Sequence, residues 1–133
     1  MSFPQAAFRE FMETMPVPAY LFNGRTRRFV AANTQYCDLV GYTEQELTIL
    51  PWPQIMADDG QVQFAHHAMR SQTADASVQW RHRKKNGSTI TFFISHQPVT
   101  LIDGNNVEEE VLFAVIVACD DRPALSARQA FAG

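Results

Sequence analysis

The sequence has 133 residues, of which 46% are hydrophobic and 19% charged, and its formal net charge at pH 7 is −3. This length and composition fit one globular domain with a single core, and the negative charge argues against a nucleic-acid-binding protein. No apolar run reaches the roughly 20 residues of a membrane helix, and residues 1–10 lack the pattern of a signal peptide. Cys37 and Cys119 form neither a disulfide framework nor a metal-ligand spacing, so a cytoplasmic location is expected.

The first half of the chain predicts short helices around two strands. Residues 5–15 are expected to form an amphipathic helix, because the spacing i, i+3, i+4 and i+7 places four side chains on one apolar stripe: Phe8, Phe11, Met12 and Met15. Short strands are expected at 19–22 and 28–32, with a turn between them. Three short helices follow, with N-caps at Asn33, at Thr43 and at Asp58 or Asp59, and the last is expected to run to about Ser71.

The second half predicts three strands, at 77–84, 88–99 and 107–120, separated by turns rich in Gly, Asn and Asp. Helices and strands are therefore largely segregated along the chain. This arrangement is typical of an α+β fold, with an antiparallel sheet and helices on one of its faces.

The register of the first hairpin in this half follows from its apolar side chains, which fall at even positions on both strands. Directly opposed residues share a face, so even positions must pair with even positions. A three-residue loop, Lys85 to Gly87 with Gly87 left-handed, satisfies this requirement. Trp80 is then expected opposite Phe92, and His82 opposite Ile90.

The strand at 107–120 is apolar on both faces, with Leu112, Ala114, Ile116 and Ala118 on one side and Val111, Phe113, Val115 and Val117 on the other. Its outer face therefore needs a cover. The stripe of the N-terminal helix, from the same chain or from a partner, can supply it, which suggests a homodimer. The candidate dimer contacts are Phe8, Phe11, Met12, Met15, Phe93, Phe113 and Val115.

The inner face of the sheet combines large and small side chains with two histidines, and short helices must cover it. A pocket between helices and sheet is one interpretation, and a dry core made by the same residues is the other. The two histidines suggest an apolar or aromatic ligand with one polar group. The candidate lining residues are Phe22, Val30, Leu39, Met56, Met69, Trp80, His82, Phe92, Ile94, His96 and Ile116.

Two stretches, AANTQYCDLVGYTEQEL (31–47) and WRHRKKNGSTITFFISHQPV (80–99), resemble motifs of the PAS domain family. The first is similar to the family's N-x-x-x-x-x-x-x-G-Y-[ST]-x-x-E-L stretch, and the second to its R-x-x-x-[KR]-[DN]-G-[ST] strand turn. The resemblance covers residues 17–121. It implies a five-stranded antiparallel sheet in the order 2-1-5-4-3. The amphipathic helix of residues 1–16 is expected on the opposite face from the short helices, where it covers the apolar outer side of the strand at 107–120. Residues 122–133 are expected to be a tail or the start of a linker.

The resemblance also implies a sensory or dimerisation module within a bacterial signalling protein, such as a histidine kinase, a diguanylate cyclase or a transcriptional regulator. The expected function is to bind a small ligand and relay the event through dimer contacts to an output domain in cis or to a signalling partner. The alternatives are a ligand-free interaction module and a heme-binding sensor. We expect the chain to be a fragment of a larger protein.

No cofactor is assigned, because each class of cofactor found in the family requires different residues. The light-sensing LOV branch needs a reactive Cys in a stretch that corresponds to LPWPQIMADDG here, and no Cys is present, so no covalent flavin is expected. Non-covalent flavin is left open by the position of His82. Heme would take His66 or His67 but not both, since adjacent helical residues point about 100° apart.

Neither a metal site nor an enzyme is expected. The four histidines lack His-x-x-x-His spacing, and no set of Asp, Glu or Cys accompanies them. The sequence has no G-x-S-x-G nucleophile motif and no phosphate-binding glycine loop, and pocket histidines are more often satisfied than catalytic.

Overall fold

The computed structural model describes residues 2–57 and 78–120. In chain order its elements are β1 (Ser2–Pro4), α1 (Gln5–Thr14), β2 (Ala19–Asn23), β3 (Arg28–Ala32), α2 (Thr34–Val40), α3 (Glu44–Ile49), α4 (Trp52–Ile55), β4 (Val78–Arg83), β5 (Thr89–Ile102) and β6 (Glu108–Asp120). The helix expected after Asp58 and the tail at 122–133 lie outside the described residues. The one-turn helix α4 was not predicted, because the Pro-Trp-Pro stretch indicated only a break, although proline is tolerated in the first turn of a helix.

The predicted caps hold the short helices in place. Asn33 accepts a hydrogen bond from the backbone of Tyr36 at the start of α2, and Gly41 ends that helix with a left-handed φ of 84°. Thr43 and Glu46 form the predicted capping box at the start of α3. These signals are local in sequence, so the helix boundaries could be predicted well.

The five antiparallel strands lie in the order β3-β2-β6-β5-β4, as expected for 2-1-5-4-3. The predicted strand count is wrong, because β1 is a sixth strand that pairs in parallel with the second half of β5, Ser2 opposite Thr100. Three residues are too few to show a period-2 pattern, so the sequence carried no signal for this strand.

The β4–β5 hairpin has the predicted register. Trp80 lies opposite Phe92 and His82 opposite Ile90. The chain turns between Lys84 and Ser88, which are joined by a backbone hydrogen bond of 2.7 Å, and Gly87 has a φ of 92°. The parity of the apolar residues was therefore sufficient to choose the loop length.

Two shifts in strand register place Val30 and Ala118 on the opposite face of the sheet from the one predicted. Leu21 pairs with Ala31 and Phe22 with Phe29, so Val30 is an extra residue in β3 and packs on the outer face instead of the predicted inner one. In β6, Val117 is the extra residue. Ala118 therefore lies opposite Phe93 and shares its face, and not the face of Ile116 as predicted.

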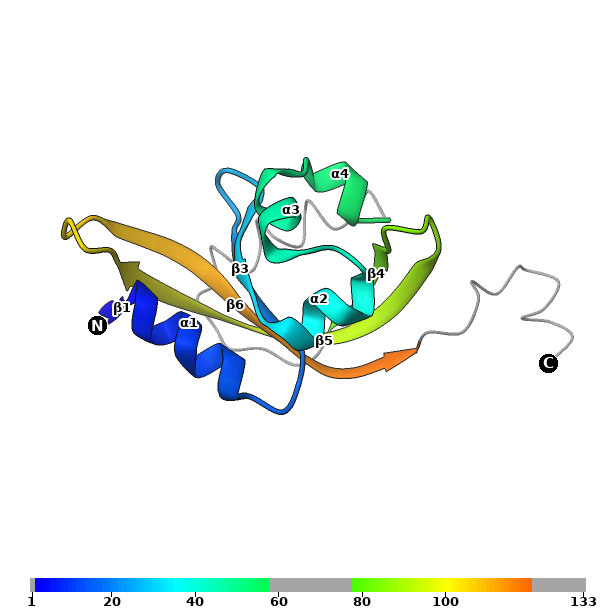
Figure 1. Ribbon diagram of the computed structural model, residues 1–133, viewed down its shortest axis with the longest axis horizontal. Helices are drawn as coiled ribbons and strands as arrows, with labels where there is room; N and C mark the ends of the chain where they lie inside the picture. Colours follow the sequence, from blue (N-terminus) through cyan, green and yellow to red (C-terminus); the bar gives the residue numbers. More distant parts are fainter. Residues whose placement is uncertain (1, 58–77, 121–133) are drawn as a thin grey trace, which may run out of the picture.

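The sheet separates two layers, with α1 on one face and α2, α3 and α4 on the other (Figure 1). The face under α2–α4 carries an inner cluster of buried hydrophobic residues: Tyr20, Phe22, Phe29, Ala32, Tyr36, Val40, Leu47, Ile55, Met56, Trp80, Ile90, Phe92, Ile94, Ala114 and Ile116. The face under α1 carries a smaller outer cluster: Phe8, Met12, Ala19, Leu21, Ala31, Leu101 and Val111. The N-terminal helix thus covers the outer face of its own chain, which was one of the two predicted alternatives.

Candidate functional site

The inner face holds a buried histidine–tyrosine pair. His82, on β4, is fully buried, and its Nδ1 lies 2.8 Å from the hydroxyl oxygen of Tyr36 on α2. The imidazole ring also packs edge-on against Phe92, with ring centroids 4.8 Å apart. These contacts fix the ring plane and therefore the direction of its second nitrogen.

That second nitrogen, Nε2 of His82, is buried and has no hydrogen-bond partner among the residues that the structure describes. An unpaired buried polar group costs about 1–3 kcal/mol, so most such groups in folded proteins find a partner. The Tyr36 hydroxyl can donate its hydrogen to Nδ1, and this arrangement places the ring hydrogen on Nε2. His82 then presents a single donor to the interior.

His96 is the second histidine of this face. It lies on β5, opposite Ala114, and its ring contacts the indole of Trp80 with centroids 5.6 Å apart. Its side chain is 7% exposed, so it is almost as buried as His82. The two histidines therefore flank Trp80 along the inner face, one on each strand of the hairpin.

Burial determines the charge of these groups. It lowers the pKa of His82 to about 3, with a further contribution from repulsion by His96, and it lowers the pKa of His96 to about 4. Burial also raises the pKa of the Tyr20 and Tyr36 hydroxyls well above the usual value. All four side chains are therefore neutral near pH 7 and act through hydrogen bonds and ring contacts.

Most of the predicted lining residues meet at this face. Seven belong to the inner cluster or pack against it: Phe22, Leu39, Met56, Trp80, Phe92, Ile94 and Ile116. Val30 does not, because the bulge in β3 turns it to the outer face, and Met69 lies outside the described residues. The role of Tyr36 was not predicted, although its spacing from Leu39 and Val40 is typical of residues on one face of a helix.

The predicted dimer contacts divide into buried and exposed groups. Phe8 and Met12 are buried against their own sheet, and Met15 and Phe113 are half-buried beside them. Phe11 is 52% exposed. Phe93 and Val115 are half-buried. Phe8 and Met12 could contact a partner only if α1 left the sheet.

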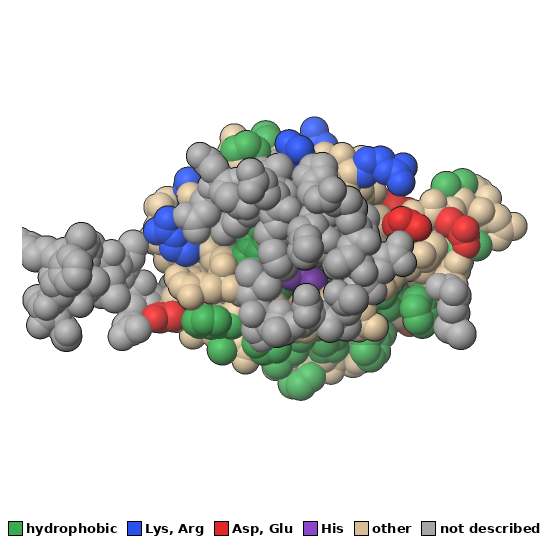
Figure 2. All heavy atoms as spheres, turned by 180° about the vertical axis from the view of Figure 1, so that it is seen from behind, with side chains coloured by type: hydrophobic (Ala, Val, Ile, Leu, Met, Phe, Trp, Pro, Cys, Tyr) green, Lys and Arg blue, Asp and Glu red, His purple; other side chains and the backbone are tan. Residues whose placement is uncertain are grey.

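Exposed apolar side chains remain near α1. Phe3 and Phe11 both contact the ring of Phe8, with centroids 5.6 and 5.8 Å apart, while their own outer surfaces face solvent. Figure 2 shows hydrophobic side chains gathered along the lower border, the side on which α1 lies in Figure 1. Phe11 belongs to the predicted dimer contacts, whereas Phe3 was not predicted; both rings are exposed enough for a partner to reach.

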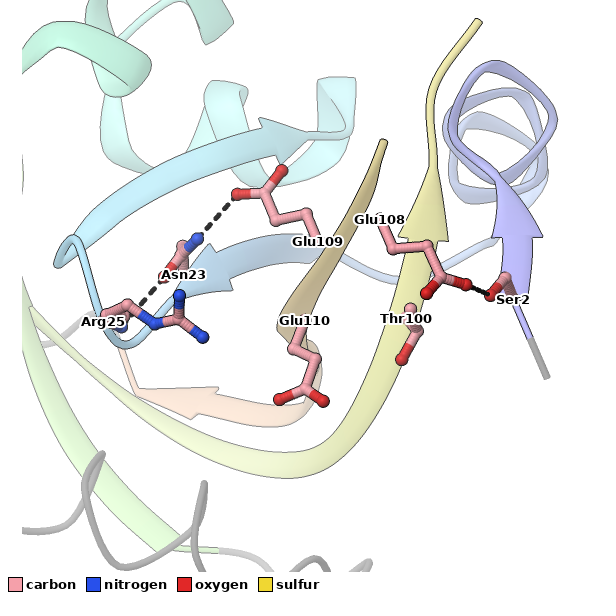
Figure 3. A pocket seen from close by; sticks show the side chains of 7 residues that line it. All are labelled: Ser2, Asn23, Arg25, Thr100, Glu108, Glu109 and Glu110. Atoms are coloured by element: carbon pink, nitrogen blue, oxygen red, sulfur yellow. Dashed lines mark hydrogen bonds between the residues drawn. The ribbon is translucent and has the colours of Figure 1, made fainter. Parts of the chain in front are cut away.

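A polar groove of about 480 Å³ lies near the turn end of the β5–β6 hairpin (Figure 3). It is lined by Ser2, Asn23, Arg25, Thr100, Glu108, Glu109 and Glu110. Asn23 donates to Glu109 at 2.7 Å, and Ser2 donates to Glu108. These bonds join β1 and the end of β2 to β6, so the polar residues that line the groove have a structural role.

Metal sites, membrane-spanning helices and heme ligands can be assessed only for the residues that the structure describes. Within residues 2–57 and 78–120, no group of three or more His, Cys, Asp and Glu side chains is arranged to hold a metal ion. Within the same residues no helix has the length and hydropathy needed to span a membrane. His66 and His67, the only predicted heme ligands, lie outside them.

A family model described as PAS domain matches residues 6–70, and no curated protein matches the sequence. Among solved structures, the PAS domain of a protein from Desulfitobacterium hafniense is 22% identical, with a TM-score of 0.61 over 85% of this chain and 99% of that one.

Two further structures have the same fold at lower identity. A domain of a sensory box sensor histidine kinase/response regulator from Geobacter sulfurreducens is 16% identical, with a TM-score of 0.60 over 84% of this chain and 91% of that one. A LOV protein from Rhodobacter sphaeroides is also 16% identical, with a TM-score of 0.58 over 84% of this chain and 64% of that one. The sequence match at 6–70, together with this shared fold, shows that the chain belongs to the PAS domain family.

Proposed function

We propose that this PAS sensory module binds a small apolar or aromatic ligand on the inner face of its sheet, and that one polar group of the ligand pairs with His82. The observation that carries the proposal is the buried Nε2 of His82, which has no hydrogen-bond partner among the described residues. A ligand acceptor at this atom would remove the penalty of an unpaired buried donor. The surrounding aromatic and aliphatic side chains suit an apolar body.

The signal then passes to the outer face and changes how α1 packs in a homodimer. The exposed rings of Phe3 and Phe11 support this step, since they extend the outer cluster to the surface. The module acts without catalysis of its own, in the cytoplasm, on an output domain or a partner such as a histidine kinase. Both cysteines are free, in keeping with a reducing compartment.

A ligand-free interaction module is the second candidate, and the same exposed rings favour it. The two candidates differ in whether the inner face takes up a molecule. Large aromatic side chains can fill such a face by themselves, as the ring contacts among Tyr20, Phe29 and Tyr36 illustrate.

Native mass spectrometry of the purified protein, with a visible absorption spectrum of the same sample, separates the candidates. We expect a colourless protein with an added small mass that is lost in His82→Phe and kept in a matched variant of an exposed β4 residue, Gln79→Ala. An unliganded dimer would favour the interaction module. A Soret band abolished by His66→Ala or His67→Ala would instead identify a heme sensor.

A further inference from the structure

We infer that Asn33 couples the Tyr36–His82 pair on the inner face to the docking of α1 on the outer face. The two faces would then communicate around the β3 edge of the sheet, by hydrogen bonds, and not only through the packing of the sheet itself. The inference rests on the proposed function for the origin of the signal, but the coupling is a property of the chain without any ligand.

Asn33 lies between β3 and α2 with only 1% of its side chain exposed, and it makes four side-chain hydrogen bonds. Its Oδ1 accepts from the backbone N–H groups of Tyr36 and Ala19, both at 3.0 Å. Its Nδ2 donates to the backbone oxygens of Met12 at 3.0 Å and Val17 at 2.9 Å. A helix cap requires only the bond to Tyr36, so the other three bonds serve to join α2 to β2 and to the end of α1.

Tyr36 connects this junction to the histidine. Its backbone N–H is bonded to Asn33, while its hydroxyl is bonded to Nδ1 of His82. Between these two ends the ring packs against Tyr20 and Phe29, with centroids 4.9 and 5.8 Å away. A displacement of the hydroxyl by a change at His82 therefore acts on the first turn of α2, where Asn33 is attached.

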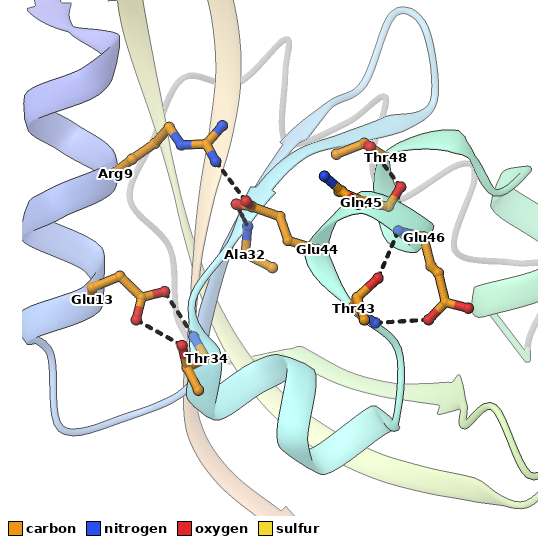
Figure 4. Close-up of polar contacts among 9 residues, drawn as sticks. All are labelled: Arg9, Glu13, Ala32, Thr34, Thr43, Glu44, Gln45, Glu46 and Thr48. Carbon is orange, nitrogen blue, oxygen red and sulfur yellow. Dashed lines mark hydrogen bonds and ion pairs between the residues drawn. The ribbon is translucent and has the colours of Figure 1, made fainter.

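Contacts at the surface follow the same route (Figure 4). Glu13 of α1 accepts hydrogen bonds from both the backbone N–H and the hydroxyl of Thr34, each at 2.9 Å. Arg9 of α1 forms an ion pair with Glu44 of α3, and the same carboxylate accepts from the backbone N–H of Ala32 at 3.0 Å. The last two turns of α1 are thus bonded to the first residues of α2 and α3, two of the three helices on the inner face.

Two kinds of contact hold α1, and they differ in how strongly they depend on orientation. Its contacts with the sheet are apolar, through Phe8 and Met12, and apolar contacts depend weakly on orientation. Its contacts with α2 and α3 are hydrogen bonds, which weaken steeply when their angles change. The position of α1 along the sheet is therefore set by α2 and α3, so a shift in those helices would be passed to α1.

Hydrogen–deuterium exchange of the whole chain in a double-mutant cycle tests this coupling. Tyr36→Phe removes the hydroxyl bond to His82, and Asn33→Ser keeps a good N-cap while removing the bonds to Met12 and Val17. We expect Tyr36→Phe to raise the exchange of amides 9–14 about fivefold relative to the β5–β6 amides, and to have little such effect in the Asn33→Ser background. Ile94→Val is the matched control, since it loosens the inner cluster without touching α2, and it should leave this ratio unchanged.

An equal effect of Tyr36→Phe in both backgrounds, or a rise no greater than in Ile94→Val, would overturn the inference. If Asn33→Ser does not fold, Glu13→Ala replaces it in the cycle, because this exposed residue supplies the parallel link to Thr34. In that cycle, an effect of Tyr36→Phe on the exchange ratio that Glu13→Ala leaves undiminished would contradict coupling along this route. So would no change of the ratio after Tyr36→Phe in the otherwise unmodified chain. The cycle needs no ligand, so its failure would leave the mass-spectrometric test of ligand binding unaffected.

Discussion

The two faces of this sheet bury different chemistry. The inner face buries the polar atoms of His82, His96 and Tyr36, whereas α1 packs on the outer face of the sheet through hydrophobic side chains. An apolar surface holds its cover by area and shape, whereas buried polar atoms accept only partners of matching geometry. The inner face is therefore suited to discriminate between molecules, and the outer face is suited to hold a helix that can be moved.

Removing a ring from the outer cluster gives the largest expected effect. Phe8→Ala empties a site between α1 and Phe113, whose rings are 5.0 Å apart, and should lower the free energy of unfolding by about 3–5 kcal/mol. Urea denaturation followed by circular dichroism measures this. A loss below 1 kcal/mol would mean that α1 is not part of the cooperative fold.

Acid should weaken the inner face more than the outer one. The pKa values of His82 and His96 are lowered to about 3 and 4, so the unfolded chain, with histidine pKa values near 6.5, binds protons that the folded chain does not. Stability is then highest above pH 6.5 and falls as the pH decreases. Between pH 7 and pH 5 we expect a loss of about 2 kcal/mol per histidine.

Urea denaturation at several pH values checks this, with His96→Gln as the comparison. This variant cannot titrate, so its stability should depend less on pH by about 2 kcal/mol over the same interval. The same pH dependence in both proteins would show that His96 is not buried in its neutral form.

Loss of the Tyr36 hydroxyl should have a moderate effect on stability. Tyr36→Phe leaves Nδ1 of His82 without its hydrogen bond, and we expect the free energy of unfolding to fall by about 1 kcal/mol. The NMR signal of the His82 ring nitrogens should shift at the same time. An unchanged ring signal would mean that the pair is not formed in solution.

The smallest expected effect on the folded chain comes from Phe11→Ala. Because this ring is 52% exposed, the stability of a monomer should change by less than about 0.5 kcal/mol. Sedimentation velocity should nevertheless show a weaker dimer, if the exposed rings form the interface. Dimerisation unaffected by this change and by Phe3→Ala would place the interface elsewhere.

The features of the fold that could be predicted are those whose sequence signals lie close together along the chain. The hairpin register could be predicted, because Trp80 and His82 are close in sequence to their partners Phe92 and Ile90. The predicted faces of Val30 and Ala118 were wrong. A bulge reverses the side of every later residue and leaves no mark in the apolar pattern.

The site itself was only partly predictable. His82 and Tyr36 are separated by 46 positions, and their contact depends on how α2 crosses the sheet, which no local pattern specifies. Asn33 was identified as a cap from its residue type. Its three further bonds arise because the turn at Met15 to Pro18 brings the backbone oxygens of Met12 and Val17 and the N–H of Ala19 to it, a tertiary arrangement.

The strand β1 has a consequence for the order in which the protein assembles. Its partners, Thr100 to Ile102, are about 100 residues further along the chain and leave the ribosome about 5–20 s later at usual rates of synthesis. Until β5 and β6 are made, Phe8 and Met12 have no sheet to cover. Residues 2–12 are therefore among the last of these residues to be buried, and for that interval their apolar side chains are open to chaperones and to neighbouring chains.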